Sequence, residues 1–414
     1  MSYLLTYDIS YKSMQIIKTL GQYRGMTAKQ LTKMIHAPVE HYALSDEKST
    51  YNFLGKLKKQ GLVLSYKLQA NVAPGSLYYL SAKGYELFKE IASVELEHYG
   101  DGWIESFEEF GDRVFGDFSY ELYKPPLSQV AHHLLLIEFF IQVKLIDGGS
   151  IVDHRLNLYA AQTYYFEQEK HRFRPDAEIW FHENNYRYTI EIDRGTEDFS
   201  KLQEKFKVYK YYFDYLKAQG KEEEIPSGII FVAESKRRLH GIKRRWATIL
   251  KAFWSKLWDY SHSVNLIFTT TDQVENTLKC EMNRREIDFH QRVKGVFPKT
   301  LYQEAICIYN NDDLSIYTIV KTKDTTAYHV VFTPLVNEYE SLIYTRWLTF
   351  YSQYEKAAKK SEDLNGLVYK GRARFIFYNN MKPFLFESFD HFELGKEITD
   401  ILNKLKINIE FKQI

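Results

Sequence analysis

The chain has little of several residue types that define particular classes of protein. It has only two cysteines, Cys280 and Cys307, in 414 residues, and their spacing matches no metal-ligand pattern. We therefore expect no zinc site of the Cys/His kind, and we interpret both thiols as small core residues in a reducing cytoplasm. The sequence also shows no internal repeat and no low-complexity linker.

Net charge and long apolar runs are scarce as well. The formal net charge is +1, which argues against a protein coated in basic surface, so contacts with nucleic acid must come from local patches. No signal-peptide pattern is found at the start, and no apolar run approaches the length of a membrane span. We expect a soluble cytoplasmic protein.

What the chain does contain is typical of folded domains. Hydrophobic residues make up 45% and aromatic residues 16%, with 33 Tyr and 28 Phe, so the chain is globular rather than disordered. Its length allows two or three domains, each with its own core. The patterns below predict a multi-domain α/β protein, with domains at 1–95, 127–295 and 296–414 and a transition at 96–126.

The most informative stretch runs from Arg174 to Tyr209. It contains two strand-like segments, Asp176–His182 and Tyr186–Ile192, joined by a polar tip of the kind found in hairpins. Side chains alternate along a strand, so Glu191 and Asp193 share one face. Antiparallel pairing would bring Asp176 beside Glu191, and the three carboxylates would then meet at one end of a sheet.

Carboxylates at close range resist ionising together unless a cation lies among them. A set of oxygen ligands suits Mg²⁺ or Mn²⁺ rather than zinc. Arg194, and Lys205 on the following helix, are the cations that would stabilise charge on a phosphate under attack. The alternative is a half-exposed hairpin with solvated acids and surface ion pairs.

These residues carry a resemblance to a known family. Pro175-Asp176, then the run from Glu191 to Glu197 (EIDRGTE), then Lys205 and Tyr209, resemble the central motif of the bacterial replication-relaxation family. That family is linked to plasmid replication and DNA relaxation, and it is similar to the PD-(D/E)XK nuclease superfamily and to the nuclease-fold class of conjugative relaxases. The resemblance implies a metal-dependent phosphodiester site in which Asp176 and Glu191 bind the metal.

The chain departs from the superfamily pattern at one position. Asp193 stands where the pattern has a lysine, two places after the acid. Three explanations stay open: Lys205 or Arg194 supplies the missing positive charge, Asp193 is an additional metal ligand, or the site holds DNA without cutting it.

Residues 1–95 have the order of a winged helix-turn-helix, with three helices, a hairpin and a last helix. The first helix carries Met14, Ile16, Ile17 and Leu20, and the second follows a Thr27 cap. The third would run from about Ser45 to Gln60 with Tyr51, Leu54 and Leu57 facing inward. Its outward face and the hairpin would then contact DNA through Ser49, Asn52, Lys56, Lys59 and Lys67. A protein-docking role for this domain is the alternative.

Two further features flank the central stretch. A strongly apolar helix at 127–145 carries the lone acid Glu138, which in nuclease-like folds would reach the metal as an additional ligand. After a buried strand at 229–233, the densest basic run of the chain enters a helix, and its cations would contact phosphates or simply form a solvated face. The candidates are Arg237, Arg238, Lys243, Arg244 and Arg245.

The region from about 304 onward shows α/β architecture but little chemistry. We expect it to extend the nuclease-like sheet, form a separate partner-binding domain, or mediate dimerisation, with a homodimer and other replication or transfer proteins left open as partners. The leading hypothesis is a plasmid- or mobile-element protein that binds an origin-like site in double-stranded DNA and nicks or relaxes it with a divalent metal. The alternative is a non-enzymatic replication initiator or transcriptional regulator with a degenerate nuclease fold.

Overall fold

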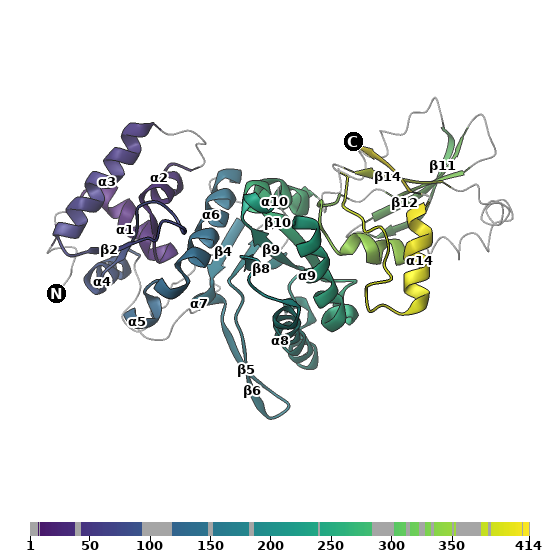
Figure 1. Ribbon diagram of the computed structural model, residues 1–414, viewed down its shortest axis with the longest axis horizontal. Helices are drawn as coiled ribbons and strands as arrows, with labels where there is room; N and C mark the ends of the chain where they lie inside the picture. Colours follow the sequence, from purple (N-terminus) through teal and green to yellow (C-terminus); the bar gives the residue numbers. More distant parts are fainter. Residues whose placement is uncertain are drawn as a thin grey trace. The chain divides into compact units, whose positions relative to one another are not determined.

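The computed structural model describes residues 7, 9–37, 43–92, 118–147, 152–181, 186–238, 241–283, 302–311, 315–322, 328–332, 335–349, 352, 374–379, 382–407 and 409–413. Within it the chain is mixed α/β (Figure 1). It divides into two compact units, the first made of Met1–Arg194 with Val232–Glu234, and the second of Gly195–Phe231 with Ser235–Ile414. Each unit is described by itself.

Residues 9–92 form an N-terminal helical module within the first unit. Its elements are α1 (Tyr11–Tyr23), β1 (Met26–Thr27), α2 (Ala28–His36), α3 (Leu44–Lys59), β2 (Val63–Lys67), β3 (Ser76–Leu80) and α4 (Ala82–Ile91). Side-chain caps fix where these helices begin: Thr27 forms a capping box with Gln30, and Ser81 accepts a hydrogen bond from the Gly84 amide. The expected helices and hairpin are all present, and the strands form one sheet in the order β1-β3-β2.

The β2–β3 hairpin packs against a helix that follows the module. Leu68, Leu77 and Leu134 form one buried cluster, and Val72 and Ala73 from the hairpin tip pack on it. The apolar side chains of the hairpin tip therefore lie against this cluster.

That helix is α6 (Val130–Asp147). The stretch Tyr120–Ile146, which contains it, is long and apolar enough to cross a membrane by length and composition, so the expectation that no apolar run approaches this length was wrong. In the structure 56% of the most apolar window is buried. Ile137, Phe139 and Ile141 are fully enclosed, which is the position of a core helix. The part of the expected transition segment that is described carries the short helix α5 (Tyr120–Tyr123).

A five-stranded sheet has the order β10-β9-β8-β7-β4. Its strands are β4 (Val152–Leu156), β7 (Ala177–Phe181), β8 (Arg187–Asp193), β9 (Gly228–Ala233) and β10 (Asn265–Thr270). The first unit contributes β4, β7, β8 and the last residues of β9. The sequence patterns predicted β7, β8 and β9 within about two residues and missed β4. The expected tip 183–185 lies outside the described residues.

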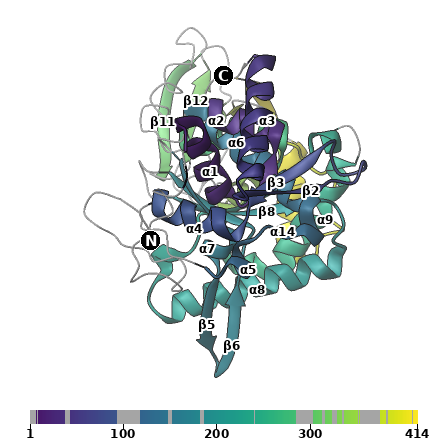
Figure 2. The ribbon, with the colours of Figure 1, turned by 90° about the vertical axis from the view of Figure 1, so that its left-hand side faces the viewer.

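A second hairpin, β5 (Gln162–Phe166) with β6 (Glu169–Phe173), lies between β4 and β7 in sequence. It follows the short helix α7 (Asn157–Ala160). Figures 1 and 2 both show its two strands extending away from the rest of the first unit. We call it the β5–β6 arm.

The second unit begins with α8 (Phe199–Ala218) and continues through α9 (Ile242–Leu257) and α10 (Val274–Asn283). Its C-terminal half forms a separate sheet in the order β11-β12-β13-β14-β15. The five strands of this sheet are not part of the β10-β9-β8-β7-β4 sheet. The elements of this half are β11 (Tyr302–Asn311), β12 (Ser315–Thr322), β13 (Tyr328–Phe332), β14 (Arg374–Asn379), α14 (Lys396–Ile407) and β15 (Ile409–Gln413).

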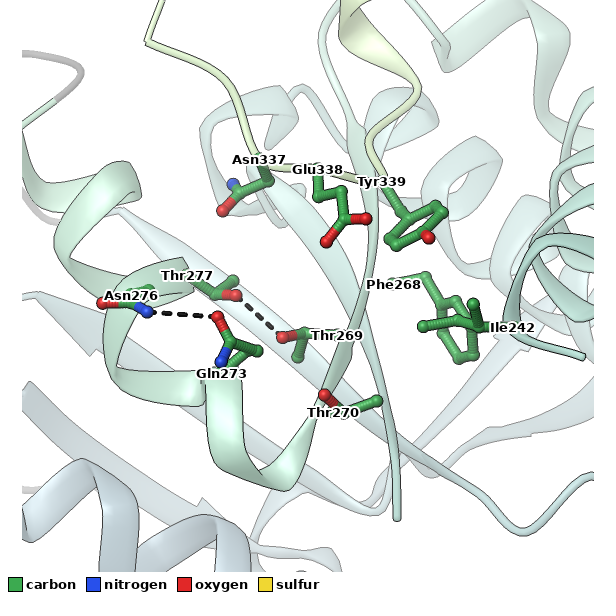
Figure 3. A pocket seen from close by; sticks show the side chains of 10 residues that line it. All are labelled: Ile242, Phe268, Thr269, Thr270, Gln273, Asn276, Thr277, Asn337, Glu338 and Tyr339. Carbon is green, nitrogen blue, oxygen red and sulfur yellow. Dashed lines mark hydrogen bonds between the residues drawn. The ribbon is translucent and has the colours of Figure 1, made fainter. Parts of the chain in front are cut away.

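Residues 337–341 are not helical, and helical structure begins at 342. The segment instead lies along β10, where the Phe268 amide donates to the Tyr339 carbonyl at 2.9 Å and the Ser341 amide donates to the Leu266 carbonyl at 2.8 Å. Figure 3 shows Asn337 and Glu338 on the side of Thr269 and Thr277, whose hydroxyls are 2.8 Å apart, and Tyr339 beside Phe268, with ring centres 6.3 Å apart. These bonds pair backbone groups of the segment with the edge of β10, so they are not left without partners.

Candidate acidic site and nucleic-acid interface

The pairing of β7 and β8 brings Asp176 to the end of the strand pair that also carries Glu191. Ala177 pairs with Ile190, and the ladder ends with this pair. The Asp176 amide donates to the same Ile190 carbonyl at 3.1 Å, so its backbone is offset from a simple continuation of the ladder. Adjacency of the Asp176 and Glu191 side chains stays a prediction.

Asp176 is held in place by two neighbours. The Ile192 amide donates to its Oδ2 at 2.8 Å, and His132 Nε2, from the start of α6, lies 3.0 Å from the same oxygen. The side chain of Asp176 keeps 19% of its surface exposed. A carboxylate that is oriented from two sides yet open to solvent is placed to receive a ligand.

Glu191 and Asp193 are buried, with 4% and 2% of their surface exposed. They occupy alternate positions of β8, and every residue of that strand except Arg187 is buried. The alternative of a half-exposed hairpin with solvated acids was therefore wrong. Burying a charged carboxylate raises the free energy of the folded protein unless a partner compensates the charge. Glu191 and Asp193 therefore destabilise the fold more than exposed acids would if they are left uncompensated.

The donors suit a hard divalent cation in an open arrangement. In the part of the chain that the structure describes, no three His, Cys, Asp or Glu side chains gather closely enough to hold a metal ion. Mg²⁺ commonly takes only one or two carboxylates and completes its shell with water and substrate phosphate. Two carboxylates, those of Asp176 and Glu191, would match that pattern, whereas the described residues form no cluster of three acids.

The two candidate cations follow β8, one in the loop directly after it and one on helix α8. Arg194 follows the strand directly and is exposed. In the second unit, Asp198 caps α8 through the Lys201 amide at 2.9 Å. Lys205, on the first turns of that helix, pairs with Glu197 at 3.2 Å and lies 5.6 Å from the Phe231 ring centre. The positive charge of Lys205 is thus already balanced by Glu197, an acid of the loop that precedes α8.

In the N-terminal helical module, α3 carries the candidate residues for duplex contact. Asn52, Lys56 and Lys59 are exposed on it, as Lys67 is on β2, while Leu54 and Leu57 are buried. Two details differ from the expectation. Tyr51 is 46% exposed rather than inward, because it packs edge-on against Tyr78 at the sheet surface. Ser49 is half-buried and its hydroxyl accepts a hydrogen bond from Lys12 at 3.1 Å.

A sequence model of the family described as replication-relaxation matches residues 17–227. This is just over half of the 414-residue chain, and it covers most of the N-terminal helical module, α6, β4 to β8 and α8. The chain belongs to the replication-relaxation family. The resemblance drawn from the central motif is thereby confirmed. No curated protein matches the chain.

Within this replication-relaxation protein, Glu138 does not join the acidic site. Its carboxylate pairs with Lys33 of α2 at 2.9 Å, and Gln30 lies 3.4 Å away. Six positions separate Glu138 from His132, so the two side chains leave α6 in different directions. The additional ligand expected at Glu138 is instead a link between α6 and the N-terminal helical module.

The basic run of this replication-relaxation protein lies beyond the family match. Arg245 is 9% exposed and donates to the Glu197 carbonyl at 2.6 Å, so it fixes a loop instead of lining a surface. Lys243 and Arg244 are exposed and line a groove of about 820 Å³ with Lys382 and Phe384. Of Arg237 and Arg238 only the backbone is described, in a short 3-10 helix.

Neither His132 nor Glu178 was among the candidate site residues predicted from the sequence. Glu178 lies on β7, where it pairs with Thr189 of β8. Glu178 is 1% exposed, and burial raises its pKa although Arg187 and Arg155 oppose the shift. The sequence signal that could have indicated Glu178 is its position two residues after Asp176, because alternate residues of a strand point to the same face. The contact of His132 had no local signal, because it joins residues 44 positions apart.

Proposed function

We propose that this replication-relaxation protein processes plasmid or mobile-element DNA in the cytoplasm. It binds an origin-like site in double-stranded DNA and nicks or relaxes the DNA there with Mg²⁺ or Mn²⁺. The observation that carries the proposal is the position of Asp176 at the end of the paired strands β7 and β8, where its carboxylate accepts a hydrogen bond from the Ile192 amide, next to Glu191, in a chain of this family.

Asp176 and Glu191 hold the metal ion in this proposal. When bound, the ion polarises a phosphate oxygen and makes a bound water more acidic. His132 is a positioning residue, because it fixes Asp176 Oδ2 from α6. Exposed Arg194 faces charge that builds on the phosphate, with Lys205 as the second candidate, and buried Asp193 adjusts the charge of the site.

The order of elements supports a PD-(D/E)XK-like domain in this region. After β7 and β8 come α8, β9, α9 and β10, the succession expected of a sheet with helices on its faces. The pattern is a likeness of fold, and the acids carry the functional argument.

We propose that the N-terminal helical module recognises duplex DNA and that it is a winged helix-turn-helix. Gln30 and Lys33 of α2 contact α6, and the hairpin tip packs on it. Of the elements in this module, α3 keeps its polar face in solvent, with Asn52, Lys56 and Lys59 exposed. A helix with short polar and cationic side chains suits a groove and its phosphates. Other replication or transfer proteins, or a second copy of this chain, would then meet the C-terminal half.

A non-enzymatic initiator or regulator is the second candidate. Two observations favour it: Asp193 stands where a nuclease of this kind has lysine, and the ammonium of Lys205 is engaged by Glu197. A site with the acids but without a free positive charge would hold DNA and not cleave it.

A nicking assay on supercoiled plasmid that carries the protein's own gene neighbourhood separates the two. We expect relaxed circles with Mg²⁺ or Mn²⁺ and none with EDTA. Asp176→Asn and Glu191→Gln should each lower the rate by more than about 100-fold, while the matched control Glu204→Gln, an exposed acid on α8, cuts normally. A normal rate in either site variant would show that the site is assigned wrongly, and binding without nicking under all metals would favour the initiator.

A further inference from the structure

The β5–β6 arm is a regular two-stranded ribbon with two different faces. Tyr165 pairs with Lys170 and Thr163 pairs with Arg172, and all four residues are exposed. The turn uses Glu167 and Gln168, both with positive φ (51° and 67°), the geometry of a tight hairpin.

The opposite face of the arm is the buried one. Tyr164 is 5% exposed and stacks on His171, with ring centres 5.5 Å apart, and Phe173 is 1% exposed. A lone two-stranded hairpin is marginal in water, so these aromatic residues anchor the base of the arm. Its outer face is then left to contact something else.

Cations follow this outer face toward the acidic site. Lys170, Arg172 and Arg174 occupy alternate positions and are all exposed, and Asp176 comes two residues later. Among the described residues, neither Lys170 nor Arg172 has an acidic partner. An anion laid along the arm would relieve this crowding of positive charge.

The spacing and setting of these cations fit a DNA backbone. Cations at alternate positions of a strand are about 6.7 Å apart along it. Phosphates two nucleotides apart on one DNA strand are separated by a similar distance along the helix axis, two steps of about 3.4 Å. The acids of the arm, Glu167 and Glu169, lie at the tip, so positive charge is concentrated at the end that meets Asp176.

We propose that the β5–β6 arm binds the phosphate backbone of duplex DNA and guides it to Asp176. Lys170 and Arg172 make the phosphate contacts, and Arg174 holds the phosphate next to the acid. This inference rests on the proposed function for the identity of its ligand, and it assigns the arm a role that neither the acids nor α3 carry.

The test is duplex binding by the full chain, measured by fluorescence anisotropy in EDTA over a range of salt concentrations with a labelled 30-base-pair duplex from the gene neighbourhood. Each lost phosphate contact lowers the slope of log affinity against log salt by about 0.9. Lys170→Gln/Arg172→Gln should lower it by about 2, and Lys170→Gln alone by about 1. The control is Lys18→Gln/Lys83→Gln, two exposed lysines on α1 and α4, which should keep the wild-type slope.

The outcomes separate this inference from the proposed function, because EDTA removes any cutting. A wild-type slope in the double variant, or an equal fall in the control, would overturn the role of the arm while leaving the metal site untouched. Lys170→Arg/Arg172→Lys keeps both positive charges and should keep the wild-type salt slope. A lower slope in this variant would mean that the substitutions act through folding of the arm, and it would overturn the phosphate contacts. Absence of duplex binding by the wild-type protein would refute both proposals.

Discussion

His133 is a neutral imidazole enclosed in the first unit. It is 4% exposed, and its Nε2 lies 2.8 Å from the Gly25 carbonyl, so this nitrogen donates a proton to the carbonyl oxygen. Burial, reinforced by Arg24, lowers the pKa of His133 from 6.5 to about 4. The unfolded chain therefore binds a proton between these two pH values that the folded chain does not.

This difference predicts a loss of stability in mild acid. The free energy of unfolding should fall as the pH drops from about 6.5 to about 4, by up to about 3 kcal/mol at roughly 1.4 kcal/mol per pH unit. Urea unfolding followed by circular dichroism at pH 7.5, 6 and 5 measures it. His133→Gln keeps a donor and should flatten the pH dependence, whereas His391→Gln, at an exposed histidine, should not. Equal pH dependence in both variants would contradict the assignment.

At the scale of elements, the close approach of α4 to the start of β2 depends on Gly84. A Cβ there would lie 2.0 Å from the Leu62 carbonyl oxygen, and that oxygen is held by the Ser81 amide at 2.9 Å. The carbonyl therefore cannot move aside without breaking the contact between helix and sheet.

Two glycine variants give a matched pair. Gly84→Ala should destabilise the protein by at least about 2 kcal/mol through overpacking. Gly55→Ala, on the exposed side of α3 where a Cβ meets nothing within 4 Å, should stabilise it by up to about 1 kcal/mol through helix propensity. Thermal unfolding measures both; similar melting temperatures for the two variants would refute the packing argument.

Local patterns predicted the elements whose signals lie within a few residues. The cap at Thr27, the strand pattern on both sides of the polar tip and the motif from Glu191 to Glu197 were sufficient to predict the second helix, the strand pair and the family. Adjacency of Asp176 and Glu191 stays a prediction from antiparallel pairing.

Contacts between distant residues were beyond such patterns. Arg24 donates to the carbonyls of Leu122, Tyr123 and Lys124, about a hundred positions away, and nothing near Arg24 in the sequence indicates them. Glu138 looked like a metal ligand because an acid on an apolar helix needs a partner, but that partner is Lys33. Arg245 looked like a surface cation because it continues a basic run, but helical periodicity turns it inward.

At the scale of the whole molecule, the net charge of +1 leaves no general field to attract DNA, so binding must be the sum of local patches. Two such patches lie in the first unit, Lys56 with Lys59 on α3 and Lys170 with Arg172 on the β5–β6 arm. If both contact one duplex, their contributions to the salt slope should add, because the residues share no partner.

The quadruple variant tests this addition. Lys56→Gln/Lys59→Gln should lower the salt slope by about 2, and the same pair combined with Lys170→Gln/Arg172→Gln should lower it by about 4. Glu191→Gln, measured beside them, should bind with the wild-type slope because its buried acid touches no phosphate without metal. If the quadruple variant lowers the salt slope no more than one double variant does, the two patches compete for DNA and do not hold one duplex together. In that case α3 would recognise a DNA site separate from the DNA that reaches Asp176.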